Sequence, residues 1–294
     1  MEFKQLEHLI YRDYPMSKAT SFKVGGPADY LFRPETIEDL QLGLQYAQHY
    51  QLPITVIGCG SNLLVTDKGI RGFVIQLAEN FSKATVHNNQ ITATSGCYFS
   101  ALSKLAAYHS LTGLEFAVGI PGSLGGAIYM NAGAYDGEIG PLIEEVVWVT
   151  ADEVGTWSRD EFTYSYRNSK AQEEGVIVAG ATLQLAPGNP EEIYAKMNDF
   201  QEKRRSKQPL EYPSAGSTFK RPPGRYVGPM IEEADLKGYS IGGAQVSTKH
   251  AGFIINTGNA TATDIINLIE FIQKTIKEKF DVDLIPEVRI IGEK

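Results

Sequence analysis

The chain has 294 residues, of which 43% are hydrophobic and 21% are charged, and its formal net charge is −8 at pH 7. This length allows one large domain or two to three smaller ones, and the acidic balance argues against a general nucleic-acid or anionic-membrane surface. The two cysteines have neither metal-ligand nor Cys-x-x-Cys spacing, and the five histidines are scattered, so no metal site and no dithiol redox centre is expected.

The beginning of the chain, Met1–His8, has no apolar segment after a basic start, so no secretory signal is visible. No stretch approaches the ~20 apolar residues that a membrane helix needs. We therefore expect a cytoplasmic protein with reduced thiols and no membrane, nucleic-acid or obligate protein partner.

The first third of the chain reads as strand, helix and strand, followed by a glycine-rich turn. Residues 1–17 form an amphipathic lead-in, residues 29–32 and 53–57 have strand character, and Thr36 is placed to cap a helix between them. The turn that follows is Gly58-Cys59-Gly60-Ser61-Asn62-Leu63. This layout is typical of nucleotide binding, but the third glycine of a Gly-x-Gly-x-x-Gly fingerprint is replaced by Leu63, and no Walker motif occurs. An ordinary turn therefore remains an alternative.

The most unusual stretch is Gly119–Gly137, which is rich in glycine and otherwise mainly small or apolar, without Lys or Arg. Such density suits a backbone that approaches a ligand closely or adopts positive φ angles. Bare N–H groups of such turns can bind an anion without a cationic side chain. We interpret the stretch as one wall of a pyrophosphate cradle; a surface loop, the alternative, would usually be more polar.

Further strands are expected over residues 73–77, 91–94, 144–150, 176–185, 253–255 and 284–291, with helices over residues 98–110, from Pro190 onward, and after a Thr263 cap. Mixed strands with few helices favour an α+β fold over a doubly wound sheet. The turn at residues 187–190 is the best boundary. It predicts a cofactor-binding region over residues 1–188 and a smaller substrate-binding domain over residues 189–294, whose final strand (284–294) returns toward the active site.

Four residues have side chains suited to catalysis or ligand binding, and each also has a purely structural interpretation. Arg167 lies among tyrosines and could simply stack on one of them; Ser217 could be a turn residue in a proline-bounded loop. Glu287 interrupts an apolar strand and could pair with Arg289. Arg204 lies in a basic run that would oppose a helix dipole. The residues alone therefore indicate only a nucleotide-type cofactor binder with a basic substrate pocket in the C-terminal third.

Taken together, the motifs resemble the UDP-N-acetylenolpyruvoylglucosamine reductase family. The matching stretches, in the family's order, are residues 22–28, 58–65, 119–137, 164–169, 215–220, 250–256 and 287–289. They span nearly the whole chain. The short stretch between Phe219 and Gly243 resembles the subgroup that lacks an extra tyrosine-bearing loop.

The resemblance implies an FAD-binding module of the vanillyl-alcohol-oxidase type followed by a smaller α+β domain, with FAD and NADPH as cofactors. It implies that NADPH reduces FAD, and that the reduced flavin then reduces UDP-N-acetylglucosamine enolpyruvate to UDP-N-acetylmuramate in peptidoglycan synthesis. The implied cofactor contacts are Gly58, Gly60, Ser61, Asn62, Leu63, Gly119, Pro121, Gly122, Ser123, Gly125, Gly126, Ala127, Asn131 and Gly133.

By the same resemblance, Arg167 stabilises the charge that develops on the substrate carboxylate, and Glu287 is its partner, protonated if it donates a hydrogen bond. Ser217 delivers a proton to C2 of the enol. The implied substrate contacts are Tyr166, Arg204, Lys220 and Arg221.

Two other functions remain open on the sequence. An FAD oxidase of the same fold would return electrons to oxygen, although no His or Cys flavin-attachment motif is obvious near the cradle. A non-catalytic sugar-nucleotide binding module would bind no flavin and would leave Gly119–Gly137 unexplained.

Overall fold

The computed structural model describes residues 3–294, and the chain forms two compact units. The first contains the segment up to Arg12 together with Tyr30–Cys59 and Gly72–Arg204, and the second contains Asp13–Asp29, Gly60–Arg71 and Arg205–Lys294. These units do not coincide with the predicted division at residue 188. Helix α5 (Pro190–Lys207) buries Ile193, Met197 and Phe200 in a core of the first unit, which therefore extends to Arg204.

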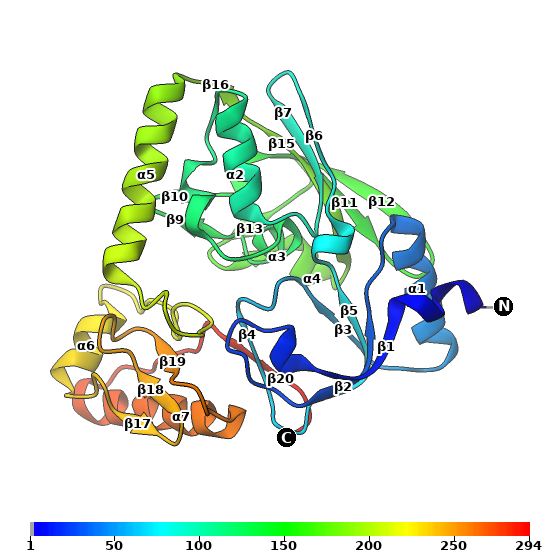
Figure 1. The fold of residues 1–294 in the computed structure, drawn as a ribbon. Coiled ribbons are helices and arrows are strands. Elements are labelled where there is room, and N and C mark those ends of the chain that lie inside the picture. Colours follow the sequence, from blue (N-terminus) through cyan, green and yellow to red (C-terminus); the bar gives the residue numbers. More distant parts are fainter. Residues whose placement is uncertain (1–2) are drawn as a thin grey trace. The chain divides into compact units, whose positions relative to one another are not determined.

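The first unit holds most of a four-stranded sheet with the order β1-β2-β5-β3 (Figure 1). Its strands are β1 (Ile10–Pro15), β2 (Pro27–Phe32), β5 (Ile70–Gln76) and β3 (Ile54–Ile57), and β3 runs parallel to β5. Helix α1 (Ile37–His49) begins at the predicted Thr36 cap, whose hydroxyl accepts a hydrogen bond from the Asp39 N–H. Leu40 and Leu44 of α1 are buried in one core with sheet residue Phe73.

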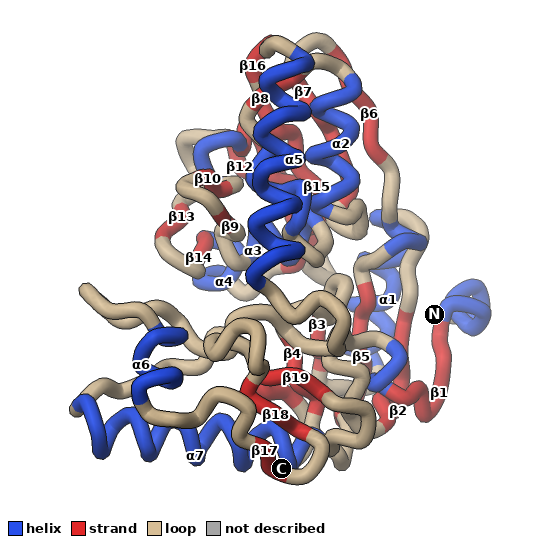
Figure 2. Tube along the Cα trace, turned by 60° about the vertical axis from the view of Figure 1, so that its left-hand side comes forward, coloured by secondary structure: helices blue, strands red, loops and turns tan. Residues whose placement is uncertain are grey.

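The larger sheet of the first unit has five antiparallel strands in the order β12-β11-β15-β7-β6. They are β12 (Val154–Ser158), β11 (Ile143–Val149), β15 (Ile177–Gln184), β7 (Gln90–Thr94) and β6 (Ala84–His87). Helices α2 (Phe99–Tyr108), α3 (Leu124–Tyr129) and α5 contribute to the same core as this sheet (Figures 1 and 2). The smaller elements near them are β8 (Leu111–Thr112), β9 (Gly133–Ala134), β10 (Gly137–Glu138), β13 (Tyr164–Ser165), β14 (Asn168–Ser169), α4 (Lys170–Glu174) and β16 (Ala186–Pro187).

The second unit is built on a three-stranded antiparallel sheet with helix α7 (Ala262–Phe280) packed against two of its strands (Figure 2). The strands are β17 (Ser240–Ile241), β18 (Ala244–Val246) and β19 (Ile254–Asn256), and α6 (Val227–Glu233) packs on α7. A parallel pair, β4 (Leu63–Val65) with β20 (Arg289–Ile291), adds Leu64 to the same core. The pairing places the strand that follows Glu287 beside the strand that follows Asn62.

The cap predicted for helix α7 is wrong by two residues. Thr261, not Thr263, is the N-cap: its hydroxyl accepts from the Asp264 N–H while the Asp264 carboxylate accepts from the Thr261 N–H. The Thr263 hydroxyl instead donates to the Asp67 carboxylate at 2.6 Å. Asp67, far away in sequence, also accepts hydrogen bonds from the N–H groups of Ala262 and Thr263. A carboxylate at a helix N-terminus satisfies donors that have no partner within the helix.

We expect Asp67→Asn to lower the free energy of unfolding by about 0.5–1 kcal/mol at pH 7, as for other exposed carboxylates at helix ends. Partial burial raises the pKa of Asp67, but the hydrogen bonds from Thr263 and Ala262 outweigh it, so the net pKa lies below its usual value. A lowered carboxyl pKa contributes stability that is present above the unfolded pKa of about 4 and is lost as the pH falls through the folded value. Thermal unfolding of parent and variant from pH 7 to pH 3 should therefore show a difference that shrinks with acid. Asp160→Asn, which removes an exposed charge elsewhere, is the control.

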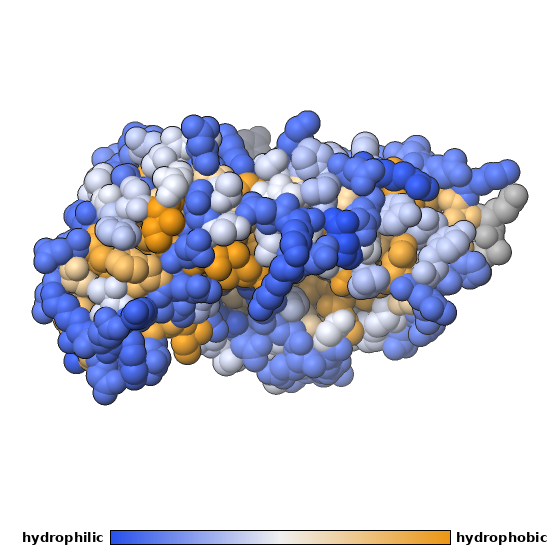
Figure 3. Space-filling view, turned by 90° about the horizontal axis from the view of Figure 1, so that it is seen from below, coloured by the Kyte–Doolittle hydropathy of each residue, from blue (hydrophilic) through white to orange (hydrophobic). Residues whose placement is uncertain are grey.

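The surface carries scattered aromatic side chains. Hydrophilic residues cover most of the face drawn in Figure 3, and hydrophobic residues gather in smaller areas between them. Several of the most exposed large side chains are tyrosines, among them Tyr108, Tyr166 and Tyr226.

No helix within residues 3–294 combines the length and the apolar character needed to cross a membrane.

Candidate active site

The glycine-rich stretch Gly119–Gly137 folds as a turn, the short helix α3 and the hairpin β9–β10. Ser123 caps α3 by accepting a hydrogen bond from the Gly126 N–H at 3.4 Å. The N–H of Gly125 donates to the Ser95 carbonyl, next to the end of β7. The first unit thus anchors the start of α3 on its larger sheet.

The two glycines of α3 differ in whether the packing of the protein leaves room for a side chain. A Cβ on Gly125 would lie 2.7 Å from the Ser95 Cβ, so the packing of the protein itself demands glycine there. A Cβ on Gly126 would meet only the Ser123 Oγ, at 3.5 Å, although glycine inside a helix costs about 0.5–1 kcal/mol relative to alanine. The nearby Ser95 Oγ is buried and has no hydrogen-bond partner within residues 3–294. The open backbone at Gly126 fits a cofactor that approaches it closely, as FAD would.

The turn at Gly58 meets the same segment inside the first unit. A Cβ on Gly58 would lie 2.2 Å from the Ser123 Oγ, so the two glycine-rich stretches touch here. The next residue, Cys59, is half-buried; burial, assisted by the nearby Glu79, raises the pKa of its thiol to about 11. Cys59 is therefore a neutral thiol at pH 7, and it hydrogen-bonds Ser123.

Arg167 occupies a strained backbone position. It is the second residue of the two-residue turn between β13 and β14, and its φ angle is 57°. Its guanidinium lies over the Tyr166 ring at 4.9 Å from the centroid, as the stacking alternative anticipates. Non-glycine residues with positive φ cost free energy and often mark functional sites.

Two side-chain amides form hydrogen bonds that hold the turn containing Arg167. Gln172 Nε2 donates to the Arg167 carbonyl at 3.2 Å, and Asn131 Nδ2 donates to the Ser165 carbonyl at 3.1 Å. Asn131 is 2% exposed and also donates to Glu138 Oε2 while accepting from the Gly140 N–H, both at 3.0 Å. Its side-chain amide therefore joins the turn to β10. The predicted cofactor contact of Asn131 stays a prediction, and its framework role was not foreseen.

An open pocket of about 650 Å³ lies beside this turn in the first unit. Its lining includes Arg167, Tyr166, Tyr135, Glu138 and Gly133. It brings together one predicted catalytic residue, one predicted substrate contact and one predicted cofactor contact. Sequence reasoning did not single out Tyr135 or Glu138, although both belong to or adjoin the glycine-rich stretch.

Arg204, near the end of α5, lies across the start of that stretch. A Cβ on Gly119 would lie 2.3 Å from the Arg204 Cδ, so glycine leaves room for the arginine. The guanidinium is half-buried, and this burial lowers the pKa of Arg204. No carboxylate within residues 3–294 forms an ion pair with it. A half-buried cation of this kind is suited to an anionic ligand.

In the second unit, the chain around Ser217 runs beside the chain around Glu287. The Glu287 N–H donates to the Thr218 carbonyl at 2.8 Å, and the Lys220 N–H donates to the Ile285 carbonyl at 2.8 Å. Ser217 is exposed, whereas Thr218 is fully buried and fixes the strand-like pairing. Three predicted site residues, Ser217, Lys220 and Glu287, are thus carried by two neighbouring segments.

Gly60, Ser61, Asn62 and Leu63 belong to the second unit as well. Gly60 has a φ angle of 64°, and a Cβ on it would lie 2.1 Å from the Ala19 carbonyl oxygen, so glycine is required. Asn62 Nδ2 donates to the Glu287 carbonyl at 3.1 Å. The Arg221 guanidinium lies 3.9 Å from the Tyr226 ring centroid in an exposed loop, and its predicted substrate contact stays a prediction.

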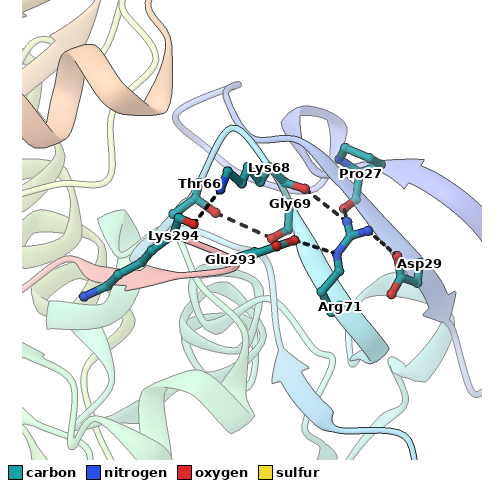
Figure 4. Close-up of polar contacts among 8 residues, drawn as sticks. All are labelled: Pro27, Asp29, Thr66, Lys68, Gly69, Arg71, Glu293 and Lys294. Carbon is teal, nitrogen blue, oxygen red and sulfur yellow. Dashed lines mark hydrogen bonds and ion pairs between the residues drawn. The ribbon is translucent and has the colours of Figure 1, made fainter.

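The end of β20 is held by a polar network (Figure 4). The Glu293 N–H donates to the Gly69 carbonyl at 2.8 Å, and the Glu293 carboxylate lies 3.5 Å from Arg71 Nε. Arg71 also pairs with Asp29 at 2.7 Å and donates to the carbonyls of Pro27 and Lys68. This network, together with the β4–β20 pairing, fixes the chain on the C-terminal side of Glu287.

Comparison with known proteins gives matches over both units. The family model for the C-terminal domain of UDP-N-acetylenolpyruvoylglucosamine reductase matches residues 208–291, and a model of an FAD binding domain matches residues 28–154. The UDP-N-acetylenolpyruvoylglucosamine reductase of Caldanaerobacter subterraneus subsp. tengcongensis is 51% identical over 98% of this chain and 95% of its own length. That of Syntrophomonas wolfei subsp. wolfei is 50% identical over 95% of this chain and 94% of its own.

One solved structure is similar over nearly its whole length. The crystal structure of UDP-N-acetylenolpyruvylglucosamine reductase (MurB) from Thermus caldophilus has a TM-score of 0.82 and 33% sequence identity, over 96% of this chain and 97% of that chain. The predicted α+β fold, with an FAD-binding domain before a smaller C-terminal domain, is confirmed.

Proposed function

Since this chain belongs to the UDP-N-acetylenolpyruvoylglucosamine reductase family, we propose that it reduces UDP-N-acetylglucosamine enolpyruvate to UDP-N-acetylmuramate in peptidoglycan precursor synthesis. Its cofactors are FAD and NADPH. The structural observation that carries the proposal is the pocket of the first unit, where Arg167 and Tyr166 lie beside Gly133 of the glycine-rich stretch. A cytoplasmic location and independence of a protein partner form part of the proposal.

The glycine-rich stretches supply groups that suit FAD. In the first unit, Gly58 and the segment from Gly119 to Gly133 would hold it, because Gly126 leaves its backbone open and the Ser95 hydroxyl is unsatisfied. Gly60, Ser61 and Leu63 are predicted contacts from the second unit, whereas the side-chain amide of Asn62 donates to the Glu287 carbonyl. FAD held there would supply the means of hydride transfer from NADPH to C3 of the enolpyruvyl group.

The side chains of the protein act on the charge and the proton of this reduction. Hydride addition at C3 of an unsaturated carboxylate drives negative charge into the carboxylate, which a fixed cation stabilises. We assign this role to Arg167, with Glu287 as a hydrogen-bonding partner of the same group. Ser217 then protonates C2; a serine hydroxyl is a weak acid, so the basicity of the enolate drives the transfer.

We expect Arg204→Ala to raise KM for the UDP-sugar substrate by roughly 10- to 100-fold with a small change in kcat, the size of a lost charged hydrogen bond. We assign the diphosphate to Arg204, because its half-buried guanidinium suits an anion. The diphosphate is equally charged in the ground state and the transition state, and such uniform binding appears in KM. Steady-state kinetics over a range of substrate concentrations measures both parameters. Arg205→Ala, the same substitution at the next, exposed residue, is the control. A fall in kcat at unchanged KM would contradict the assignment.

The proposed function is tested by the visible absorbance of the purified flavoprotein under anaerobic conditions. NADPH in slight deficit should bleach the flavin, and UDP-N-acetylglucosamine enolpyruvate should then restore its colour promptly. Recovery with oxygen alone, before any substrate is added, would favour an oxidase. If FAD neither co-purifies nor binds on reconstitution, the assignment fails.

A further inference from the structure

We propose that Asn62 is a positioning residue for Glu287: its side-chain amide holds the main-chain carbonyl of Glu287 and thereby fixes the direction of the Glu287 side chain. The inference rests on the proposed function of Glu287. It gives Asn62 a role distinct from the cofactor contact expected from the sequence.

Asn62 forms two hydrogen bonds with the segment Glu287–Arg289. Its Nδ2 donates to the Glu287 carbonyl at 3.1 Å, and its own carbonyl accepts from the Arg289 N–H at 3.0 Å. The residue between them, Val288, is 3% exposed and belongs to the core of the second unit. The parallel pairing of β4 with β20 begins immediately afterwards, at Leu63 and Arg289. The hydrogen bond from the Asn62 side chain thus continues the β4–β20 pairing in the N-terminal direction, as far as Glu287.

The other side of the Glu287 peptide is fixed by the segment that carries Ser217. The Glu287 N–H donates to the Thr218 carbonyl at 2.8 Å. Thr218 is itself immobilised: it is fully buried, its N–H donates to the Gly252 carbonyl at 2.9 Å, and its hydroxyl accepts from the Ile254 N–H at 3.1 Å. Glu287 therefore has its N–H and C=O groups held from two different segments, the N–H by the Thr218 carbonyl and the C=O by the side chain of Asn62.

The chemistry of the contact requires an amide. The Glu287 carbonyl needs an N–H donor. An ionised aspartate has the same shape as asparagine but cannot supply such a donor. Without it, the half-buried carbonyl must find another partner and the peptide is free to rotate. Because catalytic hydrogen bonds tolerate displacements of well under an ångström, a small rotation at Glu287 should slow the reaction that uses its carboxyl.

The test compares Asn62→Ala and Asn62→Asp with Gln45→Ala. Gln45 is a matched control, because its side-chain amide also donates to a distant main-chain carbonyl, that of Ala151, at 3.0 Å. We expect both Asn62 variants to retain FAD, and NADPH to reduce their flavin at the parent rate. Flavin reoxidation by the enolpyruvyl substrate should slow about tenfold, which is the scale of one misplaced hydrogen bond. Amide hydrogen exchange at residues 287–289 should become faster in the Asn62 variants and stay unchanged in Gln45→Ala.

A double variant separates positioning from other roles. If Asn62 acts through Glu287, Asn62→Ala should slow reoxidation no further in a Glu287→Ala background. Loss of FAD from the Asn62 variants, or equal slowing of both half-reactions, would show a cofactor role and overturn the inference. If Glu287→Ala is slow but Asn62→Ala behaves like Gln45→Ala, positioning by Asn62 is wrong while the role of Glu287 stands. If Glu287→Ala reoxidises at the parent rate, the role of Glu287 fails and the inference fails with it.

Discussion

Replacing Ser217 by alanine should leave reduction of the flavin by NADPH at the parent rate and slow its reoxidation by the enolpyruvyl substrate by about 10²- to 10⁴-fold. This range is the usual contribution of a positioned proton donor. The hydroxyl is exposed on a segment whose neighbour Thr218 is fully buried, so removing one oxygen atom should cost little stability. Stopped-flow absorbance of the two half-reactions, measured separately, gives both rates.

Two further variants sharpen this test. Ser240→Ala makes the same change at an exposed serine of β17 in the same unit and should alter neither rate. Ser217→Cys keeps a proton donor, so part of the reoxidation rate should return relative to Ser217→Ala. Equal loss in both half-reactions of Ser217→Ala would show that the hydroxyl serves cofactor binding or folding, and proton donation would have to be assigned elsewhere.

Local sequence signals predicted those elements whose causes are local. Pro190, followed by two glutamates, begins helix α5 as expected, because proline suits the first helical position and acidic residues suit the first turn. Thr36 caps α1 for a similar reason. At α7 the capping box joins Thr261 to Asp264, whereas the Thr263 hydroxyl donates to the carboxylate of the distant Asp67.

Contacts between distant segments could not be predicted from the chain in order. The parallel pairing of β4 with β20 joins Leu63 to Arg289, and a three-residue apolar strand carries no information about its partner. The same holds for Asn131, for which the family resemblance implies a cofactor contact; its buried amide also donates to the Ser165 carbonyl beside the turn of Arg167. The motif residues were found by resemblance, but the hydrogen bonds of the Asn62 and Asn131 side chains are visible only in the fold.

Replacing Arg167 by alanine should slow flavin reoxidation by the enolpyruvyl substrate by about 10²- to 10³-fold, as when one donor to a developing oxyanion is removed. The substrate carboxylate is already anionic before hydride transfer, so part of the effect should appear as a higher KM. The larger part should appear in kcat, because the charge on the carboxylate grows in the transition state. Arg167→Lys should fall between parent and alanine, since lysine keeps the charge but not the planar fork of donors.

The positive φ angle of Arg167 allows backbone strain to be separated from charge. Arg167→Gly removes the guanidinium as Arg167→Ala does, but glycine adopts a φ of 57° without steric cost. Glycine should therefore be the more stable of the two variants and yet equally slow in reoxidation. Arg159→Ala, at an exposed arginine paired with Glu144 in the same unit, controls for the loss of a surface guanidinium. If the glycine variant instead recovers the parent reoxidation rate, the turn geometry and not the cation matters, and the charge-stabilising role of Arg167 is wrong.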